Sequence, residues 1–187
     1  AGGVVDGVGQ TLFVDFTRAS EISAWKSVND NVMGGRSTGT LSADTEDGEN
    51  CGVFAGVLST QNNGGFSSVR GPGSTGFDLS AFAGLAIRMK GDGRQYKIAI
   101  KTDNNFDSPS YQADFMSEAG QGWVTKEIKW SSFQASWRGR IVDAPRLSGK
   151  GITSLGLMIS FLTDSGAKYK DFRTGAFRLA IKFIKPF

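Results

Sequence analysis

Regular alternation between apolar and charged residues is the feature that most limits how this sequence can fold. In residues 176–183, large apolar residues stand at every second position, and Arg178 and Lys182 stand between them. Successive side chains of a β-strand point to opposite faces, so this period is typical of an antiparallel strand with one buried face. The segment therefore predicts a half-buried strand.

The same alternation occurs twice between positions 84 and 101. One run has apolar residues at positions 85, 87 and 89, and the other has them at 96, 98 and 100, with Lys97 and Lys101 turned outward. Between the runs lies the pair Asp92-Gly93, and Asp-Gly favours a tight two-residue turn because such a turn needs positive φ. We therefore expect residues 84–101 to form a β-hairpin.

Other short apolar segments are separated by turns rich in Gly, Asn and Pro, and glycine supplies 26 of the 187 residues. The further candidate strands are 12–16, 53–58, 66–70, 111–116, 123–130 and 155–161. Helical periodicity is nearly absent, and we expect one or two helical turns at 20–26 and at 131–135. About nine short strands predict an all-β chain folded as a single antiparallel β-sandwich, or jelly roll. With no linker or repeat, one domain is expected over 1–187, with 1–10 as an N-terminal extension.

Composition disfavours several classes of function. The chain has no His and one cysteine, Cys51, so the commonest general base, an internal disulfide and a thiolate metal site are all missing. No run reaches the roughly 18 apolar residues of a membrane span. The net charge of +3 is spread along the chain rather than clustered as in nucleic-acid-binding proteins. We expect no enzyme activity, no cofactor and no nucleic-acid partner.

Two oxygen-rich runs are candidates for calcium binding. Residues 44–50 hold four carboxylates around a glycine, and residues 102–107 form a shorter run of the same kind. Neither has the full spacing of an EF-hand loop, and acidic turns are common on protein surfaces. We expect surface turns at both runs and no metal site.

A set of aromatic and basic residues near turns has two interpretations. The set consists of Trp25, Arg70, Trp137, Arg138 and Arg140. Trp and Arg are the usual anchors of protein interfaces, and Trp can also stack on sugar rings. In the other interpretation, Trp25 and Trp137 close the ends of the sandwich and the arginines pair with internal carboxylates. Both interpretations stay open at this point.

Several ordered blocks of the sequence resemble one known family. Trp25 is followed by Asn29, Asp30, Asn31, Val32, Met33, Gly34, Gly35 and Arg36, which look like the signature of the thirty-kilodalton complex I intermediate-associated protein family. Further blocks follow in family order at 54–59, 63–66 with Arg70, 88–96, 111–115, 133 with 137–140, 152–159 and 175–184. The resemblance covers residues 11–187.

The resemblance carries expectations of its own. It implies a galactose-binding-like β-sandwich and supplies no catalytic residues. Mitochondrial members of the family are chaperones of respiratory complex I assembly, and some plant relatives serve photosystem II biogenesis. The form of residues 29–35 is similar to that of the bacterial and plastid branch.

We therefore expect a non-catalytic assembly factor or accessory subunit, bound peripherally to an organellar membrane electron-transport complex, either a photosystem or respiratory complex I. The alternative is a carbohydrate-binding module that uses loop-tip aromatic and polar residues. The residues expected to contact the partner are Arg70, Arg94, Trp137, Arg138 and Arg140.

Two further expectations concern turns and location. The residues expected to act as structural turns are Asn29, Asp30, Gly34, Gly35, Gly91, Asp92 and Gly93. The start Ala1-Gly2-Gly3 suits cleavage after small residues. Together with the resemblance, it favours the chloroplast, including the thylakoid lumen, over the mitochondrion.

Overall fold

The computed structural model describes residues 4–5, 11–12, 14–29, 37–59, 65–105, 107–137, 140–160 and 174–187. Its elements are β1 (Val4–Val5), β2 (Thr11–Leu12), β3 (Val14–Asp15), α1 (Ala19–Ser23), β4 (Lys26–Asn29), β5 (Thr38–Glu46), β6 (Glu49–Leu58), β7 (Phe66–Arg70), β8 (Gly84–Lys90), β9 (Gln95–Lys101), β10 (Ser110–Met116), β11 (Val124–Lys129), η3 (Trp130–Ser132), β12 (Gln134–Trp137), β13 (Arg140–Ile141), β14 (Ser154–Ser160) and β15 (Gly175–Pro186).

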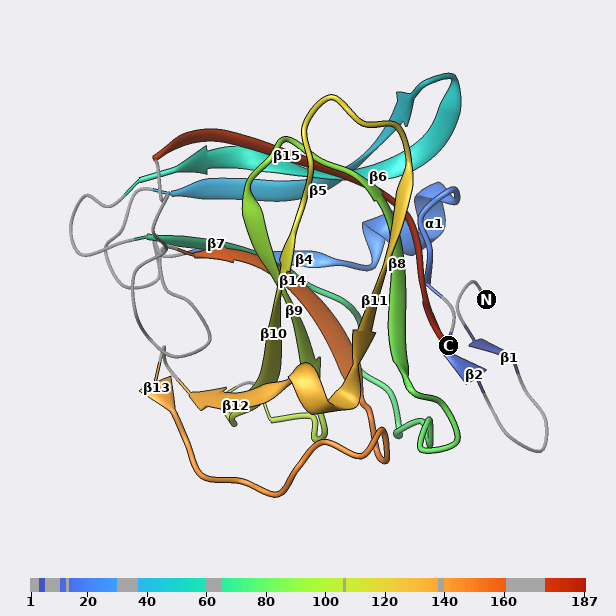
Figure 1. Cartoon of the computed structure of the whole chain (residues 1–187), viewed down its shortest axis with the longest axis vertical. Helices are drawn as coiled ribbons and strands as arrows, with labels where there is room; N and C mark the ends of the chain where they lie inside the picture. Colours follow the sequence, from blue (N-terminus) through green and yellow to red (C-terminus); the bar gives the residue numbers. More distant parts are fainter. Residues whose placement is uncertain are drawn as a thin grey trace.

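The strands form two large antiparallel sheets that face each other (Figure 1). One sheet has seven strands in the order β13-β12-β10-β9-β14-β7-β4. The other has six, in the order β11-β8-β15-β6-β5, with β3 paired to the end of β15. A separate two-stranded sheet joins β1 and β2. This architecture confirms the predicted all-β antiparallel sandwich.

Alternating residues of both sheets fill the space between them. On β9, Tyr96, Ile98 and Ile100 are fully buried, and they face Phe54 of β6 and Leu179 of β15 within one continuous hydrophobic cluster. Burying side chains of this size supplies the main favourable term in folding. The period of two in the sequence therefore located the core face of these strands correctly.

The predicted hairpin over residues 84–101 is wrong. β8 belongs to the six-stranded sheet, where it pairs with β11 and β15, and β9 belongs to the seven-stranded sheet, where it pairs with β10 and β14. Both edges of each strand are thus paired with other strands, so β8 and β9 do not pair with each other. The loop around Asp92-Gly93 carries the chain from one sheet to the other. Alternation reports which face of a strand is buried, but it does not report the partner strand.

The hairpin that does use an Asp-Gly pair lies elsewhere. β5 and β6 are joined by Asp47 and Gly48, whose φ angles are +52° and +77°, and Glu46 pairs directly with Glu49. Positive φ at both central residues matches the twist of antiparallel strands. The acidic run 44–50 therefore forms the end of a long hairpin.

Several boundaries differ from the predicted ones. Segment 12–16 is divided between β2 and β3, and β4, β5 and β12 were not predicted because their sequences are largely polar. Helical turns occur at α1 and η3, but the last two residues of the second predicted helical segment, 131–135, belong to β12. In β15 the register shifts between Ile181 and Phe183, so Ile184, and not Phe183, continues the fully buried face.

Candidate binding groove on the seven-stranded sheet

The outer face of the seven-stranded sheet carries a row of side chains that changes abruptly in size. Residues paired directly across neighbouring strands project to the same face. From β7 to β12, successive pairings align Arg70, Gly156, Ala99, Gln112 and Gln134. Long polar side chains thus stand on both sides of a glycine and an alanine, and the sheet is hollowed between them.

This hollow is a shallow pocket of about 50 Å³. Its lining residues come from β7, β9, β10, β14 and the loop before β10: Ser68, Val69, Arg70, Ala99, Lys101, Ser108, Ser110, Gln112, Ser154, Leu155, Gly156, Leu157 and Met158. None of them is aromatic. Buried sites for small molecules are roughly 300–1,000 Å³, so this pocket suits a single side chain or a small ion.

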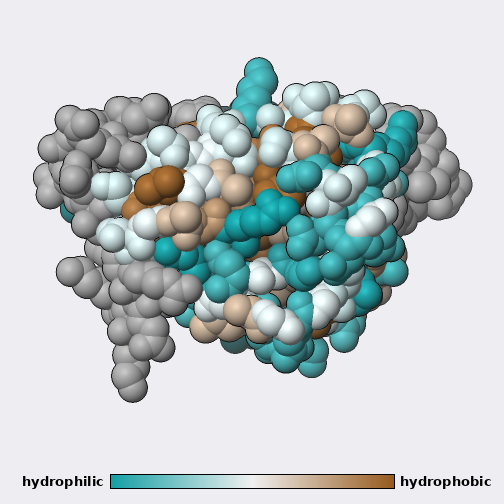
Figure 2. All heavy atoms as spheres, turned by 90° about the horizontal axis from the view of Figure 1, so that it is seen from above, coloured by the Kyte–Doolittle hydropathy of each residue, from teal (hydrophilic) through white to brown (hydrophobic). Residues whose placement is uncertain are grey.

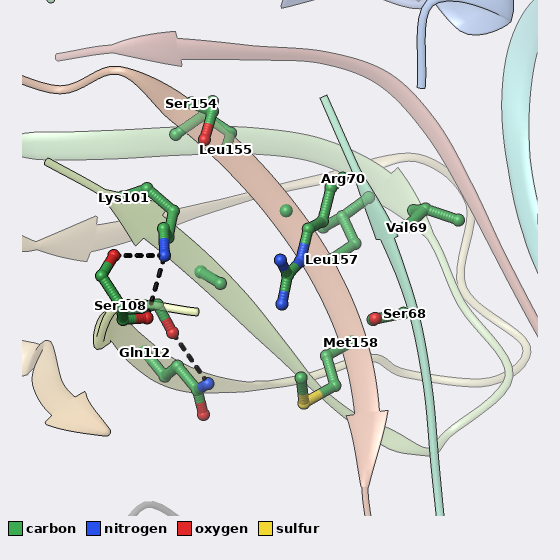
Figure 3. A pocket seen from close by; sticks show the side chains of 13 residues that line it. Ser68, Val69, Arg70, Lys101, Ser108, Gln112, Ser154, Leu155, Leu157 and Met158 are labelled. Carbon is green, nitrogen blue, oxygen red and sulfur yellow. Dashed lines mark hydrogen bonds between the residues drawn. The ribbon is translucent and has the colours of Figure 1, made fainter. Parts of the chain in front are cut away.

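Lys101 and Arg70 approach the pocket from opposite sides (Figure 3). The Lys101 ammonium donates hydrogen bonds to the carbonyl oxygen of Ser108 at 2.9 Å and to its hydroxyl oxygen at 2.5 Å. The Arg70 guanidinium points into the space between Lys101, Gln112 and Met158. Gln112 is oriented by a hydrogen bond from its amide nitrogen to the Ser110 hydroxyl, at 3.1 Å.

Burial makes both cations less stable in their charged forms. Burial lowers the pKa of Arg70 from its ordinary value. Burial also lowers the pKa of Lys101, an effect that Asp103 opposes and that the positive charge of Arg70 reinforces. The pocket therefore brings together two cations that are partly removed from water and that repel each other.

Positive charge dominates the rest of this face as well. Lys97 of β9 is nearly buried, and its ammonium lies 2.8 Å from an oxygen of Asp114 on the neighbouring β10. Lys26 of β4 pairs with Arg70 across the edge of the sheet. Among the residues that the structure describes on these strands, the face holds four cations, Lys26, Arg70, Lys97 and Lys101, and one carboxylate, Asp114.

The outer face of the six-stranded sheet has a different charge pattern. Arg178 lies 2.7 Å from Glu46, Lys90 lies 3.0 Å from the other oxygen of Glu46, and Lys182 lies 2.5 Å from Glu49. Figure 2 looks onto the side where β5, β6 and β15 lie and shows hydrophilic side chains gathered across it, with smaller hydrophobic spots between them.

Carboxylates of the predicted acidic run are thus used in ion pairs. The side chain of Arg178, followed by that of Lys90, lowers the pKa of Glu46. Within the described residues, no three Cys, Asp or Glu side chains are grouped so that they could hold a metal ion.

The structure does not bring the predicted contact residues together. Arg70 lies in the pocket. Trp137 and Arg140 are cross-strand neighbours at the far edge of the same sheet, and the Trp137 indole, 37% exposed, donates to the carbonyl of Asp107 at 2.9 Å. Strand alternation places Trp137 on the face opposite Gln134, and so opposite Arg70. Arg138 lies outside the described residues.

Arg94 is placed inside the molecule. It is 9% exposed, and its guanidinium donates to the carbonyl of Thr174 at 3.1 Å. This placement favours a structural role over the predicted surface contact. Trp25 is buried in the main core, which favours the structural interpretation for this residue, whereas Trp137 is partly exposed. Trp130, which was not among the candidates, is also buried in the core.

The predicted turn residues fall in two places. Asn29 ends β4, and Asp30, Gly34 and Gly35 lie outside the described residues. In the sheet-crossing loop, Gly93 has a φ of +87°, and a Cβ on Gly91 would overlap the side chain of Ser117.

Of the residues that line the pocket, sequence reasoning singled out Arg70 alone; the ones it missed include Lys101, Gln112 and Gly156. Alternation had already turned Lys101 outward, but nothing local to the sequence shows that β7, β14, β9 and β10 lie side by side. A hollow that depends on four strands becomes visible only with their register.

Comparison with known proteins identifies the family. The sequence profile described as Complex I intermediate-associated protein 30 matches residues 14–181, which include every strand of the groove. The chain belongs to this family. The predicted resemblance is confirmed.

Similar curated proteins are distant from this chain in sequence. A protein of Schizosaccharomyces pombe is 29% identical over 160 residues, which are 78% of this chain and 73% of that protein. Complex I intermediate-associated protein 30, mitochondrial, of Mus musculus is 27% identical over 194 residues, 92% of this chain and 54% of the relative. The Drosophila melanogaster protein of the same name is 25% identical over 69% and 49%. The chain spans about half the length of the mouse and fly relatives.

Solved structures similar to this family member share its fold. The family 11 carbohydrate-binding module of the Clostridium thermocellum cellulase Lic26A-Cel5E superimposes with a TM-score of 0.61 at 16% identity, over 96% of this chain and 95% of the module. The same kind of module in complex with a mixed-linked tetrasaccharide also gives 0.61, at 15% identity, over 98% and 94%. At these identities the likeness shows the sandwich fold alone. In the described part of the chain, no helix has the length and apolar character needed to cross a membrane.

Proposed function

We propose that this chain is a non-catalytic factor that binds an assembling membrane electron-transport complex and contacts it through the groove on the seven-stranded sheet. The observation that carries the proposal is the family match over residues 14–181, because the matching mouse and fly proteins are named for association with complex I intermediates. The groove favours a binding role because two cationic side chains, Arg70 and Lys101, point into its pocket from opposite sides.

The chemistry of the groove supports binding over catalysis. Among the described pocket residues, the Ser108 hydroxyl and the Lys101 amine lie 2.5 Å apart. Such a contact is the arrangement by which an amine could activate a hydroxyl as a nucleophile. However, the Ser108 hydroxyl donates its proton to Asp103, at 2.6 Å, so Lys101 donates to the hydroxyl oxygen and does not act as its base. The contact therefore holds the loop before β10 in place.

The partner complex has two candidates. Respiratory complex I is favoured by the names of the mouse and fly relatives, which are also called mitochondrial. A photosystem in the chloroplast is favoured by the form of residues 29–35. In both cases the chain is an organellar protein bound at the periphery of a membrane complex.

Carbohydrate binding is the second candidate function. It is favoured by the sandwich fold shared with a family 11 module. The chemistry of the groove favours it less, because sugar sites use aromatic rings as stacking platforms and none of the residues lining this pocket is aromatic.

Depletion of the protein in its source cells tests the proposal. Membrane complexes are solubilised and separated on native gels, with in-gel NADH oxidation for complex I and chlorophyll for photosystems. We expect one complex to be lost, with a smaller intermediate accumulating, and wild-type protein to restore it. Unchanged complexes of both kinds after depletion would contradict an assembly role, and binding to a glycan array would then favour the carbohydrate alternative.

A further inference from the structure

The pocket is suited to an anion. Two cations, Arg70 and Lys101, reach it from opposite sides, and burial makes each charge less stable there than in water. The charge of Arg70 further disfavours the charge of Lys101, while Asp103 opposes that effect. An anion seated between them would be attracted by both and would offset that repulsion. Hydrogen-bond donors nearby, including the Gln112 amide, would add to its recognition.

The size of the pocket limits the anion. Its volume of about 50 Å³ exceeds what one water molecule needs and is far below that of a nucleotide or sugar site. Gly156 forms part of the floor, and a Cβ there would lie 3.1 Å from the Val69 carbonyl and 3.7 Å from the Cβ of Ala99. A carboxylate at the end of a short side chain fits this space.

The surroundings of the pocket suit a chain segment that carries several such carboxylates. Lys26 and Lys97 lie on strands on either side of Arg70. Two described carboxylates lie nearby: Asp114 is 2.8 Å from the Lys97 ammonium, and Asp103, in the loop after β9, is 4.0 Å from the Lys101 ammonium. On the other sheet, Lys90, Arg178 and Lys182 are all matched by acidic side chains of the protein itself. The seven-stranded face holds four cations, Lys26, Arg70, Lys97 and Lys101, against the described carboxylates Asp114 and Asp103, so it keeps an excess of positive charge. This excess favours an acidic partner for the seven-stranded face.

We propose that the pocket takes the carboxylate of an Asp or Glu side chain from an extended acidic segment of a partner protein. Arg70 and Lys101 hold that carboxylate, and the small residues Gly156 and Ala99 let the segment approach the sheet. The exposed Lys26 attracts a flanking acidic residue. This inference rests on the proposed function, since it names the chemistry of the surface that the assembling complex would present.

A direct binding measurement tests the chemistry. The probe is a fluorescein-labelled decapeptide of alternating Glu and Thr, and the matched control is the same peptide with Gln in place of Glu. We expect the acidic probe to bind, the Gln probe not to bind, and the affinity to fall as salt is raised from about 50 mM to about 500 mM. Binding of both peptides with equal affinity would overturn the proposal.

Charge-removing variants locate the site. Arg70→Gln and Lys101→Gln are each expected to weaken binding by about tenfold, and their double variant by more, as is typical for hydrogen bonds to charged groups. The double variant Arg88→Gln/Lys129→Gln removes the same charge from β8 and β11 and should bind the probe as wild type does. Equal weakening by both pairs would mean that net charge alone attracts the peptide.

A third variant tests the pocket without changing any charge. Its result also does not depend on whether the double variant folds. Ala99 is half-buried and faces the groove, so Ala99→Leu fills the pocket while every charge remains. We expect it to abolish binding with an unchanged far-UV circular dichroism spectrum. Full binding by a folded Ala99→Leu variant would exclude the pocket.

Two comparisons distinguish this inference from binding of a lipid headgroup and from the proposed assembly role. Vesicles of about 30% phosphatidylserine should not compete with the peptide, and effective competition would assign the pocket to a lipid headgroup and overturn the proposal. In the depletion assay, Arg70→Gln/Lys101→Gln should fail to restore assembly. If it restores assembly as wild type does, the pocket proposal is wrong while the assembly role stands. If wild type itself has no effect, the assembly role is wrong.

Discussion

The carboxylate of Asp92 accepts a hydrogen bond from the backbone N–H of Arg178, at 2.8 Å, across 86 positions of the sequence. The same carboxylate accepts hydrogen bonds from the Tyr96 hydroxyl and the Arg94 N–H, both at 3.0 Å, and from the Ser117 hydroxyl at 3.3 Å. Asp92 thus ties the sheet-crossing loop to β9, to β15 and to the end of β10. One side chain joins the two sheets at this end of the sandwich.

Replacing Asp92 by Ala should lower the free energy of unfolding by about 2–4 kcal/mol, because the fully buried Tyr96 hydroxyl would lose its acceptor. Burial, followed by the charge of Asp92, raises the pKa of Tyr96 well above its ordinary value, so this hydroxyl stays a donor throughout the usual pH range. Urea denaturation measures the effect. Asp143→Ala, at an exposed position, is the control and should change stability by less than about 0.5 kcal/mol.

Two glycines of the same loop should differ in their response to alanine. Gly93→Ala is expected to lose about 1 kcal/mol, because φ is +87° but its new Cβ would meet only ordinary contacts. Gly91→Ala should lose more, about 2–3 kcal/mol, since its Cβ would overlap the nearly buried Ser117. Thermal unfolding of the two variants side by side tests which of them loses more stability. If Gly91→Ala were more stable than Gly93→Ala, the described packing of this loop would be contradicted.

Glu46 should make stability depend on pH in the acid range. Its pKa is lowered in the folded state from the ordinary 4.5, chiefly by Arg178 and then by Lys90. Its contribution is therefore complete above about pH 4.5 and is lost as pH falls through the lowered pKa. Glu46→Gln should reduce stability by about 1 kcal/mol at neutral pH. The difference from wild type should vanish in acid, and a difference that persists at low pH would mean that packing, and not charge, is responsible.

The two tryptophans that flank β11 should respond differently to replacement by phenylalanine. The Trp130 indole donates to the Phe82 carbonyl at 2.7 Å, so Trp130→Phe should lose about 2–3 kcal/mol. The buried Trp123 indole nitrogen has no acceptor among the described residues, and the Lys182 ammonium lies 4.7 Å from its ring centre. Trp123→Phe should change stability by less than about 1 kcal/mol in chemical denaturation, and a larger loss would point to an acceptor outside the described residues.

Binding of the acidic peptide should weaken in alkaline solution before exposed lysines lose their charge. Burial, reinforced by Arg70, lowers the pKa of Lys101 below the ordinary 10.5, and only the protonated amine attracts a carboxylate. Affinity should fall as pH rises through that lowered pKa, leaving the contribution of Arg70. Lys101→Gln should remove this pH dependence, which fluorescence anisotropy across the alkaline range would detect. An unchanged pH profile in the variant would assign the titration to another group.

Much of the fold could be predicted because strand alternation is a local property. The runs around Ile98 and Leu179 each specify which of their side chains are buried, whatever their partner strands are. The candidate site was predicted less well. Arg70 was singled out, and it lines the pocket. Arg94, however, is nearly buried, and Trp137 lies on the other face of the sheet. The sequence around these two residues does not indicate either placement.

The two Asp-Gly pairs show where the limit lies. Both were able to supply a tight turn, and by itself the sequence determined that the chain reverses direction at each of them. At Asp47-Gly48 the strands pair with each other. At Asp92-Gly93 they separate, because both edges of β8 and of β9 bond to strands from distant parts of the chain. Local sequence sets the backbone geometry of the turns and the buried face of each strand. The partner of each strand follows from non-local hydrogen bonding and burial, which only the complete tertiary structure decides. The Arg70–Lys101 pocket depends on those strand partners and is decided in the same way.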